Sequence, residues 1–513
     1  MPALVEASSN EARYQWDATR LQIRGSSLFL MGRFLSLGAN CLTQVLIVRY
    51  LSTVDYGALS YVLATVAFLQ LFGTLGLQEA VSRFIPIYRE NHDYEKLFGT
   101  IVFAAGVVAC TGIPMIAIVQ GRSYFIAHAN LTMQLLSMLI FLVPVQAADM
   151  LLDALFASFA STRDIFFRKY VLGPGLKLGV ALLLIWRRSN VIFFAAGYLA
   201  TSALAVALYG WMLVRLLRDQ GLPQHLTSKR IKIPGRELLA FVLPGLSAVL
   251  ATAAINSINM LLLGQMQPLS EVAYYRAAVP LAEMNNVVMA SFTLLFTPTA
   301  ARMFARGDYG GINKLYWHTA AWMSVVAFPI FASTFSLARP LTLLLYGSRY
   351  QHTALVLAVL ALGSYFNVTL GFNLQTLKVI GRLRYIIITS LFAALANFMV
   401  NLYLIPRYGA VGAAAGATVV LIGYNLLLQL GLGQIPKFKA FDRSYLSMYA
   451  TAALGASGLL VFQLVTPSGL AITVPLALCT SLALFLVSRK KLNVAATFPE
   501  LYRVPFMRAL LNY

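Results

Sequence analysis

The stretch YIIITSLFAALANFMVNLYLI at 385–405 contains no charged residue and is long enough to cross a membrane as a helix. A hydrocarbon core of about 30 Å is spanned by about 20 helical residues. A second apolar run, GAVGAAAGATVVLIGYNLLLQLG at 409–431, follows after only Pro-Arg-Tyr at 406–408. The two runs therefore predict a pair of transmembrane helices joined by a short turn.

Apolar runs of this length recur along the whole chain. Of its 513 residues, 59% are hydrophobic and 11% are charged, with a mean hydropathy of +0.75. Soluble domains average about 25% charged residues. We expect an all-α polytopic membrane protein with about 14 transmembrane helices, at 28–48, 57–80, 98–119, 131–158, 170–186, 191–214, 238–263, 272–298, 315–336, 352–377, 385–405, 409–431, 446–465 and 468–488.

The basic residues alternate from loop to loop in a way that supports this count. With the N-terminus inside, 29 of the 39 Lys and Arg residues fall in the tails and inner loops, and seven fall outside. The positive-inside rule predicts this asymmetry, and a missed helix would have scrambled it. Short basic loops that face anionic membrane lipids also account for the net charge of +21, so no nucleic-acid partner is needed.

Two halves are suggested by a long basic connection and a weak repeat. VDYGALSYVLA at 54–64 resembles EVAYYRAAVPLA at 271–282, although chance similarity between apolar sequences is the alternative. An even number of helices per repeat gives parallel halves with a site between them. We expect a cytoplasmic N-terminal tail (1–27), an N-lobe of six helices (28–214), a basic cytoplasmic linker (215–237), a C-lobe of six helices (238–431), two further helices (446–488) and a cytoplasmic C-terminal tail (489–513).

Catalysis is disfavoured because no loop is long enough to hold a catalytic domain. The sequence has no Walker A, HExxH, CxxC or GxSxG element, and we expect no cofactor, metal or ATP coupling within the chain. The three cysteines, Cys41, Cys110 and Cys479, are widely spaced in apolar runs and are expected to be packing residues.

Ionisable residues inside the predicted spans are the candidate functional residues, because each costs about 2.5–3.5 kcal/mol to insert. Asp149 and Asp153 are four residues apart, so they share a helix face where a proton could bind. Glu283 is a third candidate for ion coupling. Alternatively, Lys177 neutralises one aspartate, or both lie beside Arg163 at the inner interface.

A cationic cavity is the second hypothesis. Arg33 and Arg276 lie in spans 1 and 8, one in each half, with no acidic residue three or four positions away on the same helix. Guanidinium groups suit phosphate, so this arrangement indicates an anion-binding cavity to which Lys177 could contribute. Snorkelling to an interface is the alternative for either arginine. Arg83 is expected to form an interfacial pair with Glu79.

Two segments resemble a known family. LSTVDYGALSYVLATVAFLQLFGTLGLQEAVSRFIP at 51–86 and QTLKVIGRLRYIIITSLFAALANFMVNLYLIPRYGAVGAAAGAT at 375–418 are similar to the polysaccharide transporter branch of the multidrug/oligosaccharidyl-lipid/polysaccharide exporter superfamily. Many members of this branch are regarded as twelve-helix proteins, from which helices 13 and 14 depart. Lipid II flippases of the superfamily have fourteen helices and arginines in helices 1, 2 and 8, the helices that carry Arg33, Arg83 and Arg276 here.

The resemblance implies a flippase in the bacterial inner membrane that moves lipid-linked (polyprenyl-pyrophosphate) oligosaccharides by alternating access, for surface or exopolysaccharide biosynthesis. Anionic membrane lipids and other polysaccharide-assembly membrane proteins would be its further partners. In such flippases the cationic cavity is associated with phosphate or acidic sugars. An ion-coupled exporter of small molecules with the same fold is the nearest alternative, and a membrane glycosyltransferase or polymerase is a third.

Overall fold

The computed structural model describes residues 32, 35–125, 130–159, 166–221, 231–466, 469–489 and 491–492. These residues form helices and turns, and no strand occurs among them. In the described part of the chain, each of the fourteen predicted spans falls on one helix or on two consecutive helices. Ten of the described helices are long and apolar enough to cross a membrane, or eleven if the bent helix over 269–305 is counted. The chain is therefore an all-α, multi-pass membrane protein, as predicted.

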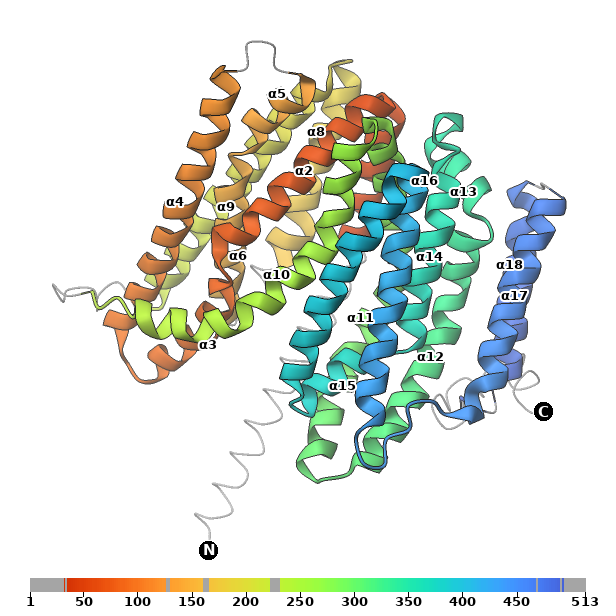
Figure 1. Cartoon of the computed structure of the whole chain (residues 1–513). Helices are drawn as coiled ribbons and strands as arrows, with labels where there is room; N and C mark the ends of the chain where they lie inside the picture. The colour runs from red at the N-terminus through yellow and green to blue at the C-terminus, as the bar shows by residue number, and fades with distance from the viewer. Residues whose placement is uncertain are drawn as a thin grey trace, which may run out of the picture. The chain divides into compact units, whose positions relative to one another are not determined.

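Figure 1 shows the helices of the chain. Contacts between residues divide the chain into two compact units with three boundaries, of which 64/65 and 246/247 fall inside helices and 51/52 lies in a turn. Unit 1 comprises residues 1–51 and 65–246. Its described part contains a helix at 35–50 followed by the end of α2 (Thr53–Thr74), α3 (Leu77–Glu90), α4 (Tyr94–Phe125), α5 (Leu131–Leu139), α6 (Leu142–Ser158), the π-helix η1 (Phe167–Leu172), α8 (Gly173–Trp186), α9 (Val191–Asp219) and the start of α10 (Gly235–Met266).

Unit 2 comprises residues 52–64 and 247–513. It contains the start of α2, the rest of α10, and then α11 (Leu269–Ala305), α12 (Tyr309–Phe335), α13 (Ala338–Tyr346), η3 (Ser348–Tyr350), α14 (Thr353–Thr369), α15 (Asn373–Val379), α16 (Leu383–Gly433), η4 (Arg443–Tyr445), α17 (Leu446–Val465) and α18 (Leu470–Ser488).

Each unit has its own apolar core. In unit 1, α6 packs against α9, and the rings of Phe156 and Tyr209 stack with their centroids 4.2 Å apart. In unit 2, the rings of Phe331 and Tyr365 stack at 4.1 Å between α12 and α14. Stacked aromatic pairs of this kind stabilise the contact between neighbouring helices.

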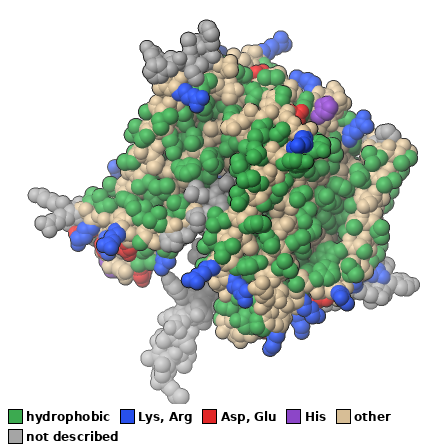
Figure 2. Space-filling model, in the orientation of Figure 1, with side chains coloured by type: hydrophobic (Ala, Val, Ile, Leu, Met, Phe, Trp, Pro, Cys, Tyr) green, Lys and Arg blue, Asp and Glu red, His purple; other side chains and the backbone are tan. Residues whose placement is uncertain are grey.

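The outward faces are also apolar. Figure 2 shows hydrophobic side chains along the visible faces of the helices and Lys and Arg side chains toward their ends. Several large apolar side chains are more than two-thirds exposed, including Trp186, Leu454 and Leu464. Lipid tails solvate such surfaces at no cost, so this pattern suits a membrane protein.

The predicted pair of spans at 385–405 and 409–431 corresponds to the single long helix α16, which is broken at Gly409. Gly409 has φ +56° and ψ −133°, a backbone conformation that L-residues rarely adopt. The Glu271 carboxylate Oε2 accepts a hydrogen bond of 2.7 Å from the backbone N–H of Ala410. It therefore caps the second half of α16 and stabilises the positive end of that helix.

Candidate polar cavity of the first unit

A polar cavity of about 320 Å³ lies among the helices of unit 1. Small-molecule sites typically enclose about 300–1,000 Å³, so this one can hold a headgroup but not a whole oligosaccharide. The walls come from the helix at 35–50 and from α2, α6, η1, α8 and α9. The polar residues among its lining are Ser36, Asn40, Gln70, Gln146, Asp149, Asp153, Arg168, Lys169, Lys177, Tyr198, Thr201 and Ser202.

Arg168 lies at the centre of this cavity wall, on the π-helix η1. The Gly173 N–H donates to the Arg168 carbonyl, five residues back, as a π-helix requires. The next residue, Pro174, has no N–H to donate, which weakens the α-helical alternative at this point. Arg168 is only 7% exposed, and its guanidinium lies 4.1 Å from the Tyr209 ring centroid. Arg168 is therefore held in place by both backbone and packing.

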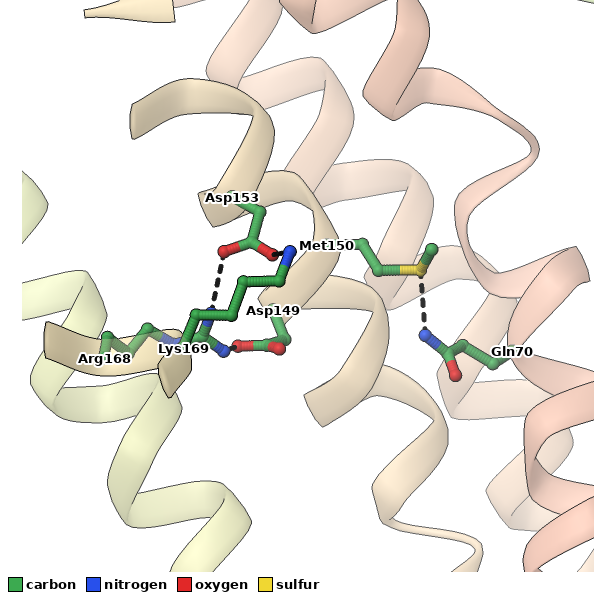
Figure 3. A network of polar contacts seen from close by, with 6 residues as sticks. All are labelled: Gln70, Asp149, Met150, Asp153, Arg168 and Lys169. Atoms are coloured by element: carbon green, nitrogen blue, oxygen red, sulfur yellow. Dashed lines mark hydrogen bonds and ion pairs between the residues drawn. The ribbon is translucent and has the colours of Figure 1, made fainter. Parts of the chain in front are cut away.

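Both aspartates of α6 bind this arginine (Figure 3). Arg168 Nη2 forms an ion pair with Asp149, and Nη1 donates to Asp153 Oδ1 at 2.8 Å. The other oxygen of Asp153 accepts from Lys169 Nζ at 3.1 Å. Nearby, the amide of Gln70 reaches the sulfur of Met150 at 2.9 Å. The four charged side chains form one neutral cluster, in which two cations balance two carboxylates.

Lys177 makes the cavity as a whole cationic. Its ammonium lies 5.0 Å from the Tyr198 ring centroid, a cation–π distance, and it forms no ion pair with Asp149 or Asp153. Among the described residues, the lining thus contributes three cations and two carboxylates. Charges interact more strongly here than in water because the surroundings are less polar.

The structure brings three of the seven predicted site residues together. Asp149, Asp153 and Lys177 line the same cavity. The alternative in which Lys177 neutralises an aspartate is wrong, because Arg168 and Lys169 are closer partners. Arg163, the other alternative partner, lies outside the described residues.

The structure tests the prediction for Arg83 but not the prediction for Arg33. Arg33 lies outside the described residues. Arg83, on α3, has its guanidinium 4.6 Å from the ring centroid of Phe241. The expected ion pair between Arg83 and Glu79 is wrong, since Arg83 packs on aromatic rings and no such pair forms. Contact with aromatic faces is a geometry that suits the planar guanidinium of arginine.

Arg276 and Glu283 both lie on α11 in unit 2. Arg276 hydrogen-bonds the hydroxyl of Tyr56 and interacts electrostatically with Glu283. Glu283 lies seven residues further along, which places it on the same helix face. The sequence prediction considered only acidic residues three or four positions from Arg276, so it did not include Glu283. Tyr56 comes from the start of α2, where Gly57 lies so close to the Leu269 carbonyl that a Cβ would collide with it.

Sequence reasoning missed Arg168 and Lys169, because both were counted with a cytoplasmic loop. The signal was present: two aspartates in an apolar span require cationic partners, and Arg-Lys stands directly before the next span. The segment's depth could not be predicted because the π-helix starts the span at Phe167 instead of residue 170.

Buried amides in unit 2 hold helices together. Asn397 and Asn401 of α16 donate to the Asn259 oxygen at 2.9 and 3.0 Å. A second chain of amides links α11, α14, α16 and α15 through Asn286, Asn367, Asn425 and Asn373. Amides inside a membrane either hold helices together or hydrogen-bond hydroxylated substrates. For those with amide partners, the structure indicates helix binding.

The fold and the charged cavity define a multi-pass α-helical membrane protein with an ion-paired polar site among its helices. The chain belongs to the polysaccharide biosynthesis protein family, whose family model matches residues 23–304. The resemblance drawn from the sequence is thereby confirmed. A curated relative, an uncharacterized membrane protein of Methanocaldococcus jannaschii, is 21% identical over 433 residues, which cover 79% of this chain and 82% of the relative.

Solved structures share the fold. A structure of the lipid II flippase MurJ in an inward closed conformation matches with a TM-score of 0.66 and 14% identity, covering 93% of this chain and 99% of the flippase. An inward-facing multidrug resistance transporter of the MATE family in the MOP superfamily matches with a TM-score of 0.59 and 14% identity, covering 83% and 95%. At this identity, the likeness concerns the fold alone.

Proposed function

We propose that the protein is a flippase of the bacterial cytoplasmic membrane that moves lipid-linked oligosaccharides between leaflets by alternating access, for surface or exopolysaccharide biosynthesis. The observation that carries this proposal is the cation excess of the cavity in unit 1, where Arg168, Lys169 and Lys177 face two carboxylates. A lipid-linked oligosaccharide joined through phosphate or diphosphate presents a compact anion of suitable size. Guanidinium and ammonium groups bind such anions most strongly away from water.

Two further findings support the substrate class. The family is described by polysaccharide biosynthesis, and a flippase of another lipid-linked precursor, lipid II, has the same fold. The cytoplasmic placement of both termini is part of the proposal and rests on the 29 inner Lys and Arg residues. Arg276 in unit 2, together with Arg33 and Arg83, remains a proposed contact for the acidic parts of the substrate.

Export of small organic cations is the second candidate, favoured by the MATE-like fold and by the carboxylates of Asp149 and Asp153. The ion pairs argue against it. Both carboxylates already bind Arg168, and the remaining charge of the cavity is that of Lys177, which repels cations.

The test is transport by purified protein in proteoliposomes. We expect transfer of a fluorescent lipid-diphosphate-linked oligosaccharide between leaflets, reduced at least about tenfold in Lys177→Gln, since losing a charged contact costs about 1.5–3 kcal/mol. Arg215→Gln, on the exposed surface of α9, is the matched control and should transfer lipid at the wild-type rate. Proton-driven efflux of small cations without any lipid transfer would favour the exporter instead.

A further inference from the structure

The Arg168 guanidinium does not use all of its hydrogen-bond donors. Its two terminal nitrogens bind two different carboxylates, one each, and its buried Nε has no hydrogen-bond acceptor among the described residues. A guanidinium prefers to present two parallel donors to one anion, as it does with phosphate. The present arrangement therefore leaves unused the binding mode for which this side chain is best suited.

We propose that the substrate's anionic group and the carboxylates of Asp149 and Asp153 compete for Arg168, so that anion binding in this cavity is coupled to protonation of the two aspartates. This inference rests on the proposed function only in that the anion belongs to the transported lipid.

The two sides of the cluster differ in how firmly they are held. The Arg168 side chain is 8% exposed and packs on Tyr209, whereas the side chains of Asp149 and Asp153 are 32% and 27% exposed. The aspartates also share one face of α6 and border the cavity. Exchange therefore moves the carboxylates away and leaves the arginine in place.

Charge fixes the direction of the coupling. With both carboxylates ionised, an incoming phosphate meets two negative charges beside the arginine that should bind it. Protonation removes both charges and frees both terminal nitrogens. Proton uptake and anion binding therefore favour each other, and by linkage each strengthens the other by the same factor. The loaded state carries the anion together with one or two protons.

The other charged and titratable groups that face the cluster come from η1, α8, α9 and α3. Lys169 and Lys177 contribute ammonium groups, and Tyr198 and Tyr209 of α9 contribute phenol rings. On α3, Glu79 borders a neighbouring pocket together with Asp153, so it is the remaining carboxylate to test. Glu79→Gln is therefore the matched control for removing one carboxylate.

Calorimetry on the purified full-length protein tests this coupling with two probes, inorganic pyrophosphate and sulfate. Sulfate keeps its charge between pH 5.5 and 8, so its pH dependence reports only on the protein. Titration in buffers of different ionisation enthalpy counts the protons taken up. We expect sulfate to bind more tightly at low pH, by up to about tenfold per pH unit for each proton taken up.

Variants separate the roles. In Asp149→Asn/Asp153→Asn, sulfate should bind tightly at every pH without proton uptake, whereas Glu79→Gln should behave as the wild type does. Asp149→Asn and Asp153→Asn alone should each lose part of the pH dependence, which covers the case in which the double variant fails to fold. Arg168→Gln should lose binding of both probes.

The outcomes also distinguish the two proposals. Wild-type binding that is independent of pH, without proton uptake but lost in Arg168→Gln, would overturn the coupling and leave the proposed function standing. Pronounced pH dependence that survives in Asp149→Asn/Asp153→Asn would overturn the coupling as well. If neither pyrophosphate nor sulfate binds at any pH and no lipid is transferred, both the coupling and the proposed function are overturned.

Discussion

At the scale of single residues, Arg168 supplies the charge that lets two aspartates remain inside the membrane domain. We expect Arg168→Gln to lower the free energy of unfolding by about 3 kcal/mol, because it leaves two carboxylates without their main cation. Thermal unfolding in detergent measures this loss. Lys169→Gln is the control: Lys169 is 50% exposed, so its pair contributes less than about 1 kcal/mol.

Restoring neutrality should restore stability. The triple variant Arg168→Gln/Asp149→Asn/Asp153→Asn has no unpaired charge in the cluster, and we expect it to recover most of the loss seen in Arg168→Gln. If the triple variant is no more stable than the single one, Arg168 stabilises the unit by packing on Tyr209 and not through its ion pairs.

The hydroxyl of Tyr56 offers a second test at this scale. Tyr56→Phe removes the hydrogen bonds of this hydroxyl to Ser60 and Arg276 and should cost about 1 kcal/mol, as measured by thermal unfolding. Tyr350→Phe is a matched control, because the buried Tyr350 hydroxyl has no hydrogen-bond partner among the residues that the structure describes, so its removal should cost nothing. Equal losses in the two variants would show that the Tyr56 hydroxyl contributes no specific bond.

At the scale of elements, the break in α16 depends on Gly409. Gly409→Ala should destabilise the protein by about 1–3 kcal/mol, since its φ is positive and the new Cβ would press on the Glu271 carboxylate. Gly423→Ala on the same helix meets open space and should be neutral or slightly stabilising. The difference between their unfolding temperatures measures the strain, and a neutral Gly409→Ala would contradict the account of the break.

The positions of the helices could be predicted from the sequence, whereas the contacts between residues distant in the sequence could not. The break between 405 and 409 follows from Pro406 and the glycines after it, which interrupt an apolar run. The cap on Ala410 comes from Glu271, more than a hundred residues away, and no local pattern reveals such a contact. In the same way, the spacing of Asp149 and Asp153 predicted a shared face, whereas the identity of their cation depended on the π-helix.

At the scale of the whole molecule, the sidedness of the chain is open to a direct test. We expect Ser348→Cys, in the turn after α13, to react with a membrane-impermeant maleimide on intact cells. Arg306→Cys, in the turn after α11, should react only after the cells are permeabilised. Both side chains are exposed, so accessibility within the protein does not confound the result. The native Cys41, Cys110 and Cys479 are first replaced by serine, and reversed labelling would contradict the positive-inside assignment.

Hydropathy predicts membrane spans because every backbone group in lipid must be satisfied within its own helix. That constraint acts locally, so the apolar helices could be predicted from residue types alone. A charged cavity is assembled from several helices distant in sequence, and its residues could be predicted only in part. Asp149, Asp153 and Lys177 were found because charge is rare in apolar runs, whereas Arg168 stood at the edge of a run and was missed.

The central claim is that this protein recognises the anionic link of a lipid-linked glycan. The most direct measurement compares, in the same proteoliposomes, the transfer rates of two lipids with identical glycans, one joined through diphosphate and one through a neutral linker. The account predicts transfer of the diphosphate lipid alone, and loss of that transfer in Arg168→Gln. Equal transfer of both lipids would contradict it, because the cations of the cavity would then have no part in choosing the substrate.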